Sequence, residues 1–351
     1  MVRPIIFASI SFVISFLIFP VFIKVFERLN WFDSPGTHKI HSDHIPSMGG
    51  VVILIGSILA LLMGLPLQQW ITLKYFFISI VLMFLIGLRD DVLALSPRQK
   101  LFSQFLPILV LVLLDNIRLA SLYELFPDYE FPELLTYFIS ILSVVIITNA
   151  YNLIDGIDGL AGVVGSIALI CFGVWFYWAG FPYQSLIALC FSGSLLAFLF
   201  FNWQPSRIFM GDTGALTIGL LLSYFGIQFI NANHGLPEEH PAKFAASIST
   251  AFCVLVVPLF DTLRVILIRL RQLRSPFQAD QNHLHHRLLG LGLTHAGASV
   301  RLGLINIFFI GMAFLLKDQS DYVILPAILL VCLAIHIVLE YLTKKKSPMY
   351  A

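Results

Sequence analysis

The sequence predicts an all-α, polytopic integral membrane protein with about eleven transmembrane helices. Of its 351 residues, 58% are hydrophobic and only 12% are charged, whereas about a quarter of the residues of an ordinary soluble protein are charged. The apolar residues are grouped in blocks of roughly 15 to 25, which is the length of a helix that crosses a bilayer. Backbone polar groups in lipid must be satisfied within each segment, so these blocks are expected to be helices.

Eleven apolar blocks follow one another along the chain, centred near residues 15, 57, 80, 108, 141, 170, 192, 222, 254, 309 and 331. The first block is too long for the apolar region of a signal peptide and lacks a small-residue cleavage site, so we expect it to remain as the first span. No fixed-period repeat, low-complexity tract or long linker divides the chain. We therefore expect one membrane-embedded domain over residues 1–351.

The basic residues predict the orientation. When residues at span ends are assigned to the nearer loop, the loops after the odd-numbered spans hold 16 lysines and arginines, and the other side holds five. Cytoplasmic loops carry the excess of basic residues, so the odd side is expected to be cytoplasmic. This places the N-terminus outside and the C-terminus inside.

Five polar segments interrupt the apolar pattern, and all of them fall on the odd side: residues 33–50, 89–100, 149–162, 202–214 and 261–287. A transporter is expected to carry its ionisable residues in mid-membrane, often on broken helices. Polar segments gathered at one interface instead suit an enzyme that takes a polar substrate from the cytoplasm and a second substrate from the bilayer.

Three carboxylates in these segments are candidates for a metal site. Asp90 and Asp91 follow the third span directly and precede Lys100, while Asp212 lies in a glycine-framed turn before the eighth span. Adjacent carboxylates repel each other unless a cation or proton lies between them, and Mg²⁺ takes one or two carboxylates together with substrate phosphates. The alternatives are a solvated pair at a helix end for the two neighbours and an N-cap for Asp212.

Asn152, Asp155 and Asp158 are spaced three residues apart, so a helix would place them on one face at the cytoplasmic end of a span. Gly156 and Gly159 would allow backbone or ligand to approach closely. Three hydrogen-bonding side chains on one face suit recognition of a nucleobase and ribose, or a share in metal binding. Helix capping would explain only one of the three.

His283, His285 and His286 form a run within four residues that follows an arginine-rich stretch. Zinc would need a fourth ligand at a suitable spacing, and none is near. Imidazoles beside arginines suit a diphosphate better, although the arginines are equally well explained as anchors for anionic lipid headgroups. Lys39 and His41 in the first cytoplasmic loop are expected to close the site.

Taken together, these segments resemble the polyprenyl-phosphate N-acetylhexosamine-1-phosphate transferase family, in the family's order and over nearly the whole chain. The resemblance implies that Asp90 and Asp91 are the family's paired aspartates, and that Asp212 is its magnesium ligand, preceded by the asparagine at Asn202. It makes residues 152–158 the nucleotide-binding segment. We thus expect Asp90, Asp91 and Asp212 to be catalytic, and Asp212, Asp91 and Asp155 to hold the metal. The expected substrate-binding residues are Lys39, His41, Lys100, Asn152, Asp155, Asp158, Asn202, His283, His285 and His286.

The family has two large branches. Its phospho-MurNAc-pentapeptide translocases carry a His-His pair followed three positions on by an acidic residue, whereas His285 and His286 are followed by Arg287, Leu288 and Leu289. The chain therefore resembles the branch that acts on UDP-GlcNAc and related sugars and starts cell-envelope polysaccharides, which implies a location in the bacterial cytoplasmic (inner) membrane with the active site on the cytoplasmic face. One departure is His38, where the family's first loop often has arginine, so no role is assigned to position 38.

The expected function is transfer of N-acetylhexosamine-1-phosphate, above all GlcNAc-1-phosphate, from a UDP-sugar to undecaprenyl phosphate with release of UMP. The alternatives are a phospho-MurNAc-pentapeptide translocase and, from another class, a lipid flippase or transporter. The expected cofactor is Mg²⁺, with Mn²⁺ as a substitute. The expected partners are UDP-N-acetylhexosamine, undecaprenyl phosphate and membrane lipids, with no nucleic acid; a homodimer is a candidate assembly.

Overall fold

The computed structural model describes residues 2–29, 45–120, 125, 131–273 and 282–346, and these residues are almost entirely helical. The helices, in chain order, are α1 (Val2–Arg28), α2 (Gly49–Gly64), α3 (Leu67–Thr72), α4 (Lys74–Val92), α5 (Pro97–Leu109), the π-helical turn η1 (Val110–Leu114), α6 (Glu133–Ile154), α7 (Leu160–Trp178), α8 (Pro182–Asn202), α9 (Gly211–His234), α10 (Ser247–Val254), α11 (Val256–Arg271), α12 (Leu284–Gly290), α13 (His295–Leu315) and α14 (Asp321–Lys346).

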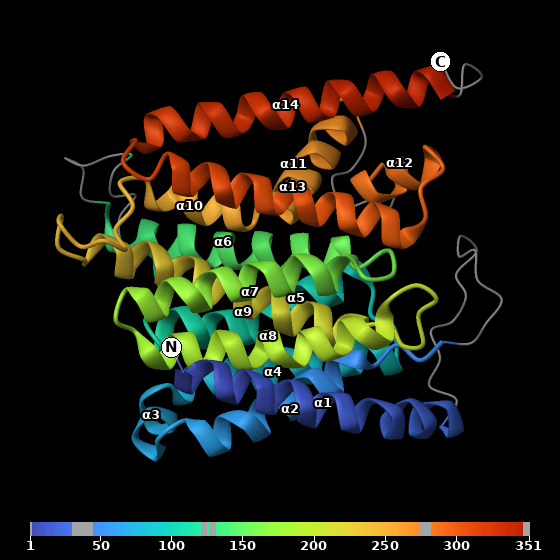
Figure 1. Cartoon of the computed structure of the whole chain (residues 1–351), viewed down its shortest axis with the longest axis vertical. Coiled ribbons are helices and arrows are strands. Elements are labelled where there is room, and N and C mark those ends of the chain that lie inside the picture. Colours follow the sequence, from blue (N-terminus) through green and yellow to red (C-terminus); the bar gives the residue numbers. More distant parts are fainter. Residues whose placement is uncertain (1, 30–44, 121–124, 126–130, 274–281, 347–351) are drawn as a thin grey trace.

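The long helices run side by side in one bundle, with α1 and α2 at one edge and α14 at the other (Figure 1). The short helix α12, the connection from α8 to α9 and the end of α14 lie at one end of the bundle. The start of α1, α3 and the connection from α9 to α10 lie at the opposite end. The two ends therefore separate the loops in the way that the alternation of predicted spans requires.

In the described ranges, helices occupy all eleven predicted positions, the ninth as a bent pair, and the chain is a multi-pass membrane protein. Eight of these helices are long and apolar enough to cross a bilayer, or nine if the bent pair α10–α11 forms one span. Among the others, α2 has only 16 residues, and α4 carries Lys74, Arg89, Asp90 and Asp91. The count of eleven membrane crossings thus stays a prediction.

The predicted ninth span is broken, since α10 and α11 meet at an angle of 86°. Pro258 in the first turn of α11 has no N–H, so it cannot bond the carbonyl of Val254 as a continuous helix would. The side chain of Asn306 on α13, which is fully buried, donates to that carbonyl at 3.1 Å. The break is therefore stabilised by a neighbouring helix, which is how irregular backbone is tolerated in a membrane.

Helix α9 forms the centre of the bundle. It packs against α2, α4, α6, α7 and α10, and 94% of its most apolar stretch is buried. Its first turn carries Asp212. Asp212 is therefore carried by the most enclosed helix of the bundle. A rigid element of this kind holds a functional side chain more precisely than a loop does.

Candidate active site

The start of α9 is fastened to the end of α4 by Asp91. Its Oδ1 accepts the amide of Asp212 at 2.8 Å, and its Oδ2 accepts the amide of Thr213 at 2.9 Å and also the Thr213 hydroxyl. These are two of the amides that a helix start leaves without partners, so Asp91 acts as an N-cap supplied by another helix. The two helices can approach this closely because residue 87 on α4 is glycine. Any larger side chain there would collide with the backbone of Asp212.

Asp90 points to a different neighbour. It is 8% exposed, its Oδ1 accepts the amide of Leu95 at 2.7 Å, and its Oδ2 lies 3.1 Å from Lys100 Nζ. Lys100 belongs to α5, whose first turn is set by the capping box of Ser96 and Gln99. The local sequence therefore fixes the end of α4 and the start of α5, and with them the contact between Asp90 and Lys100.

Asp212 joins these elements to α6. Its Oδ1 accepts from Lys100 Nζ and, at 2.6 Å, from Nδ2 of Asn152 in the last turn of α6. Asp90 and Asp212 are also close enough to interact directly. Four residues that the sequence singled out, Asp90, Lys100, Asn152 and Asp212, thus lie together at one end of the bundle. We call this set the carboxylate cluster.

The carboxylate cluster fits a divalent cation. Asp90 and Asp212 both contact one ammonium group, so their oxygens face a common cation position, and Mg²⁺ is usually held by one or two carboxylates plus substrate phosphates. Within the described ranges, no group of three or more His, Cys, Asp or Glu side chains could hold a metal by itself. These residues therefore fit a metal site in which two carboxylates bind the ion and a substrate phosphate supplies the remaining ligands.

The turn between α6 and α7 is tied down on two sides. Asn202 Oδ1 accepts the amide of Gly159 at 2.8 Å, while its Nδ2 donates to the carbonyl of Ile208 at 2.8 Å. Asp158 is 4% exposed and its Oδ2 lies 3.3 Å from Nδ1 of His295, at the start of α13. These contacts hold the predicted nucleotide-binding turn in one shape.

The histidine run lies against the same turn. A side chain at Gly156 would lie 2.5 Å from Nε2 of His285, so the ring of His285 is seated directly on the backbone of residue 156. Burial, reinforced by the neighbouring His286, lowers the pKa of His285 to about 3, so this imidazole is neutral at physiological pH. Two segments that are more than a hundred residues apart in sequence therefore meet here.

The observed contacts do not test every predicted role. Asp91 accepts hydrogen bonds from the first amides of α9, and Asn202 bridges the backbone at Gly159 and Ile208. The metal-binding role predicted for Asp91 and the substrate-binding role predicted for Asn202 stay predictions. The same holds for the half-buried Asp155 and His286. Lys39 and His41 lie outside the described residues.

Three residues that take part in these contacts were not predicted from the sequence: Thr213, Asp261 and His295. Asp261 Oδ2 lies 2.8 Å from His283 Nδ1. A single carboxylate within the apolar stretch of α11 is the signal that would have indicated Asp261, because such a group is rarely buried without a partner. Thr213 and His295 act at helix starts, and nothing in their local sequence distinguishes them.

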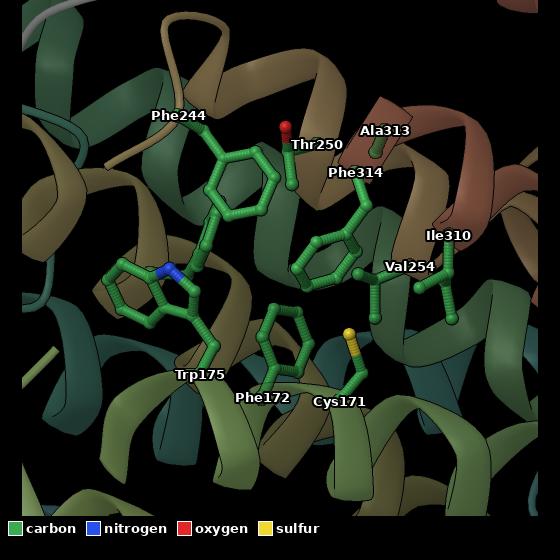
Figure 2. Close-up of a pocket in the computed structure, with 10 residues that line it drawn as sticks. Cys171, Phe172, Trp175, Phe244, Thr250, Val254, Ile310, Ala313 and Phe314 are labelled. Atoms are coloured by element: carbon green, nitrogen blue, oxygen red, sulfur yellow. The ribbon is translucent and has the colours of Figure 1, made fainter. Parts of the chain in front are cut away.

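A separate apolar pocket lies far from these groups. Figure 2 shows Phe172, Trp175, Phe244 and Phe314 around it, and its lining side chains carry no charge. They come from α7, α9, α10 and α13 and the segment before α10, toward the helix ends opposite the carboxylate cluster. This pocket has no group that could neutralise a phosphate, so the candidate site is the carboxylate cluster with the turn and histidines beside it.

Comparison with known proteins identifies similar sequences. The model of the family described as "Glycosyl transferase family 4" matches residues 73–230, a stretch that includes the whole carboxylate cluster. A Bacillus subtilis protein named "Probable undecaprenyl-phosphate N-acetylglucosaminyl 1-phosphate transferase" is 29% identical over 97% of this chain and 92% of its own length. Proteins named "Undecaprenyl-phosphate alpha-N-acetylglucosaminyl 1-phosphate transferase" from Yersinia pestis and Escherichia coli K12 are 27% and 26% identical, each over 80% of this chain and 75% of its own length. Residues 73–230 thus resemble glycosyl transferase family 4, and over most of its length the chain is similar to proteins named as undecaprenyl-phosphate N-acetylglucosaminyl 1-phosphate transferases.

Proposed function

We propose that this protein transfers N-acetylhexosamine-1-phosphate from a UDP-sugar to undecaprenyl phosphate, releasing UMP, and that the sugar is N-acetylglucosamine. The observation that carries the proposal is the carboxylate cluster, where Lys100 contacts both Asp90 and Asp212 while Asn152 donates to Asp212. The names of the relatives support the choice of sugar and lipid.

The proposed reaction is a direct displacement. An oxygen of the polyprenyl phosphate attacks the phosphorus bonded to the sugar, the bond to the UMP oxygen breaks, and UMP leaves. The nucleophile is already an anion, so the main obstacle is repulsion between two anionic substrates rather than poor nucleophilicity. Lys100 can reduce this repulsion by contacting a phosphate oxygen, and Asp90, which contacts Lys100, can keep its ammonium group in place.

Asp90 and Asp212 are the residues that would hold Mg²⁺. The ion would supply charge neutralisation to the phosphates. Asp91 is given a positioning role because its oxygens are occupied by the first amides of α9. Asn152 would keep Asp212 in the orientation in which Oδ1 faces the cation position.

The proposal includes a location for the site. The carboxylate cluster lies on the side to which the basic residues assign the cytoplasm, where a UDP-sugar would be available. The protein would then span the bacterial inner membrane with its N-terminus outside and its C-terminus inside.

The test is UMP release by the purified protein. We expect release only when a UDP-sugar, undecaprenyl phosphate and Mg²⁺ or Mn²⁺ are all present, and UDP-GlcNAc or a close UDP-N-acetylhexosamine should be used in preference to UDP-MurNAc-pentapeptide. A ratio of kcat/KM values of roughly a hundredfold, about 3 kcal/mol, is expected for a site that excludes a bulky group.

Two outcomes would contradict this assignment. Comparable efficiency with UDP-MurNAc-pentapeptide would move the protein to the translocase branch. Lipid movement between leaflets without UMP release would favour a flippase.

A further inference from the structure

Asp261 is a carboxylate that the proposed reaction does not use. It lies on α11, only 1% exposed, and both of its oxygens have partners. Oδ1 accepts the amide of Leu284 at 2.8 Å and lies 3.2 Å from Nη2 of Arg264, while Oδ2 lies 2.8 Å from Nδ1 of His283. The burial of a charge is costly unless it is paired and hydrogen-bonded, so contacts this complete indicate a specific role.

The contacts determine how the histidine run is presented. An ionised carboxylate can only accept hydrogen bonds, so the proton on the ring of His283 that faces Asp261 is on Nδ1, and Nε2 is the nitrogen left for contacts elsewhere. The amide of Leu284 is the first of helix α12, which follows directly after His283. One carboxylate therefore fixes both a ring orientation and a helix start.

The fixed segment reaches the candidate site through His285. The rings of His283 and His285 are nearly parallel, with centroids 5.7 Å apart, and the ring of His285 is seated on Gly156. Gly156 lies in the turn that follows Asn152, the residue that contacts Asp212. A continuous series of contacts thus runs from α11 through α12 to the end of α6.

We propose that Asp261 is a positioning residue of the active site, acting through His283 and Leu284 to hold the His283–His286 segment against the turn of residues 155–159. This inference rests on the proposed function, because the segment and the turn are where the UDP-sugar would bind. Asp261 itself need not touch the substrate.

The test uses the variant Asp261→Asn with Asp321→Asn as its matched control. Asp321 is also a buried carboxyl group that binds the first turn of another helix. It accepts hydrogen bonds from the amide of Ser249 on α10, at 2.8 Å, and from the Ser249 hydroxyl. It lies in the first turn of α14, at the end of the bundle away from the carboxylate cluster. Both variants replace a buried carboxyl group that accepts hydrogen bonds with an amide of the same shape, so a general loss of stability should appear in both.

Steady-state kinetics separate positioning from damage. We expect Asp261→Asn to raise the KM for the UDP-sugar roughly ten- to hundredfold, the usual effect of removing a partner that orients a ligand, and to leave the KM for undecaprenyl phosphate unchanged. Damage to the fold lowers kcat by lowering the active fraction and moves neither KM, as expected for Asp321→Asn. In the double variant, Asp261→Asn and His283→Gln together should raise the KM by less than the product of the two single effects, because the carboxylate acts in part through that ring.

Labelling of histidines with diethyl pyrocarbonate gives a readout that needs no turnover. His285 is 2% exposed, and we expect it to become reactive in Asp261→Asn but not in Asp321→Asn. Unchanged labelling of His285, an unchanged KM for the UDP-sugar, or additive effects in the double variant would each overturn the positioning role. Absence of UMP release by the wild-type protein would instead refute the proposed function, and the labelling would still decide whether Asp261 holds the segment.

Discussion

Replacing Asp91 with asparagine should separate positioning from metal binding. In the wild-type protein, each oxygen of Asp91 accepts one amide from the first turn of α9, at 2.8 and 2.9 Å. Asparagine retains one of these acceptors but presents an NH₂ group to the amide or hydroxyl at the other. One charge-assisted hydrogen bond is therefore lost, and two donors face each other at the start of the most enclosed helix.

The size of the effect follows from these contacts. A hydrogen bond to a charged group contributes about 1.5–3 kcal/mol, and loss of an N-cap costs about 0.5–2 kcal/mol. Because these describe the same interaction, we expect a destabilisation of about 2 kcal/mol rather than their sum. Asp212 directly follows the first residue of α9, so a small shift of this turn displaces it, and a misplacement of about 1 Å can reduce turnover roughly a hundredfold.

Thermal unfolding in detergent and a magnesium titration of UMP release measure the two effects. If Asp91 positions the helix, Asp91→Asn should unfold at a lower temperature, lose kcat, and keep nearly the same magnesium concentration for half-maximal activity. Asp90→Asn is the matched control, because it alters the neighbouring carboxylate that faces Lys100 and should raise the magnesium requirement. The reasoning is refuted if Asp91→Asn melts like the wild type and regains full turnover at high magnesium, since this is how loss of a metal ligand would behave.

Three further predictions concern the site and its location. Asp212→Asn should nearly abolish UMP release while the protein still unfolds cooperatively in detergent, because a neutral amide is a poor magnesium ligand; turnover within a few-fold of wild type would remove Asp212 from the metal site. Reporters fused to both ends should place the C-terminus in the cytoplasm and the N-terminus outside, and a periplasm-dependent reporter that is active at the C-terminus would contradict the proposed orientation. Gly156→Ala should lower kcat/KM for the UDP-sugar, since its methyl group would lie 2.5 Å from His285 Nε2. Gly290→Ala should not, because a methyl group there would meet nothing within 4 Å beyond its chain neighbours and the backbone of its own helix.

Much of the architecture could be predicted because lipid restricts what a chain can do. Apolar blocks of sufficient length must become helices, and the structure has helices at all eleven expected positions in the part of the chain that it describes. The break between α10 and α11 was not predicted. Pro258 alone does not decide between a kink and a full break, and the carbonyl it frees is satisfied by Asn306, which is about fifty residues further along the chain.

The sequence predicted which residues form the candidate site better than it predicted how they contact one another. Asp90, Lys100, Asn152 and Asp212 were expected to share a site because their segments fall on one side of the membrane, and they do lie together. The partner of each carboxylate depends on how α4, α5 and α9 pack. Asp261 was missed although it is the single carboxylate of α11, because its partners His283 and Leu284 lie in and just before α12, beyond the end of α11.

The two adjacent aspartates show why packing decides their roles. Neighbouring residues on an α-helix point about 100° apart, so both cannot face one ligand from the same helix turn without distortion. Asp91 faces the amides of α9 and Asp90 faces Lys100. The free amides and the helix dipole favour the ionised form of Asp91 without a metal, and they oppose burial, which raises the pKa of this carboxyl to about 7. We therefore expect the paired motif to divide into one carboxylate that builds the helix start carrying Asp212 and one that shares a cation position with Asp212, so that loss of either one should impair the site by a different route.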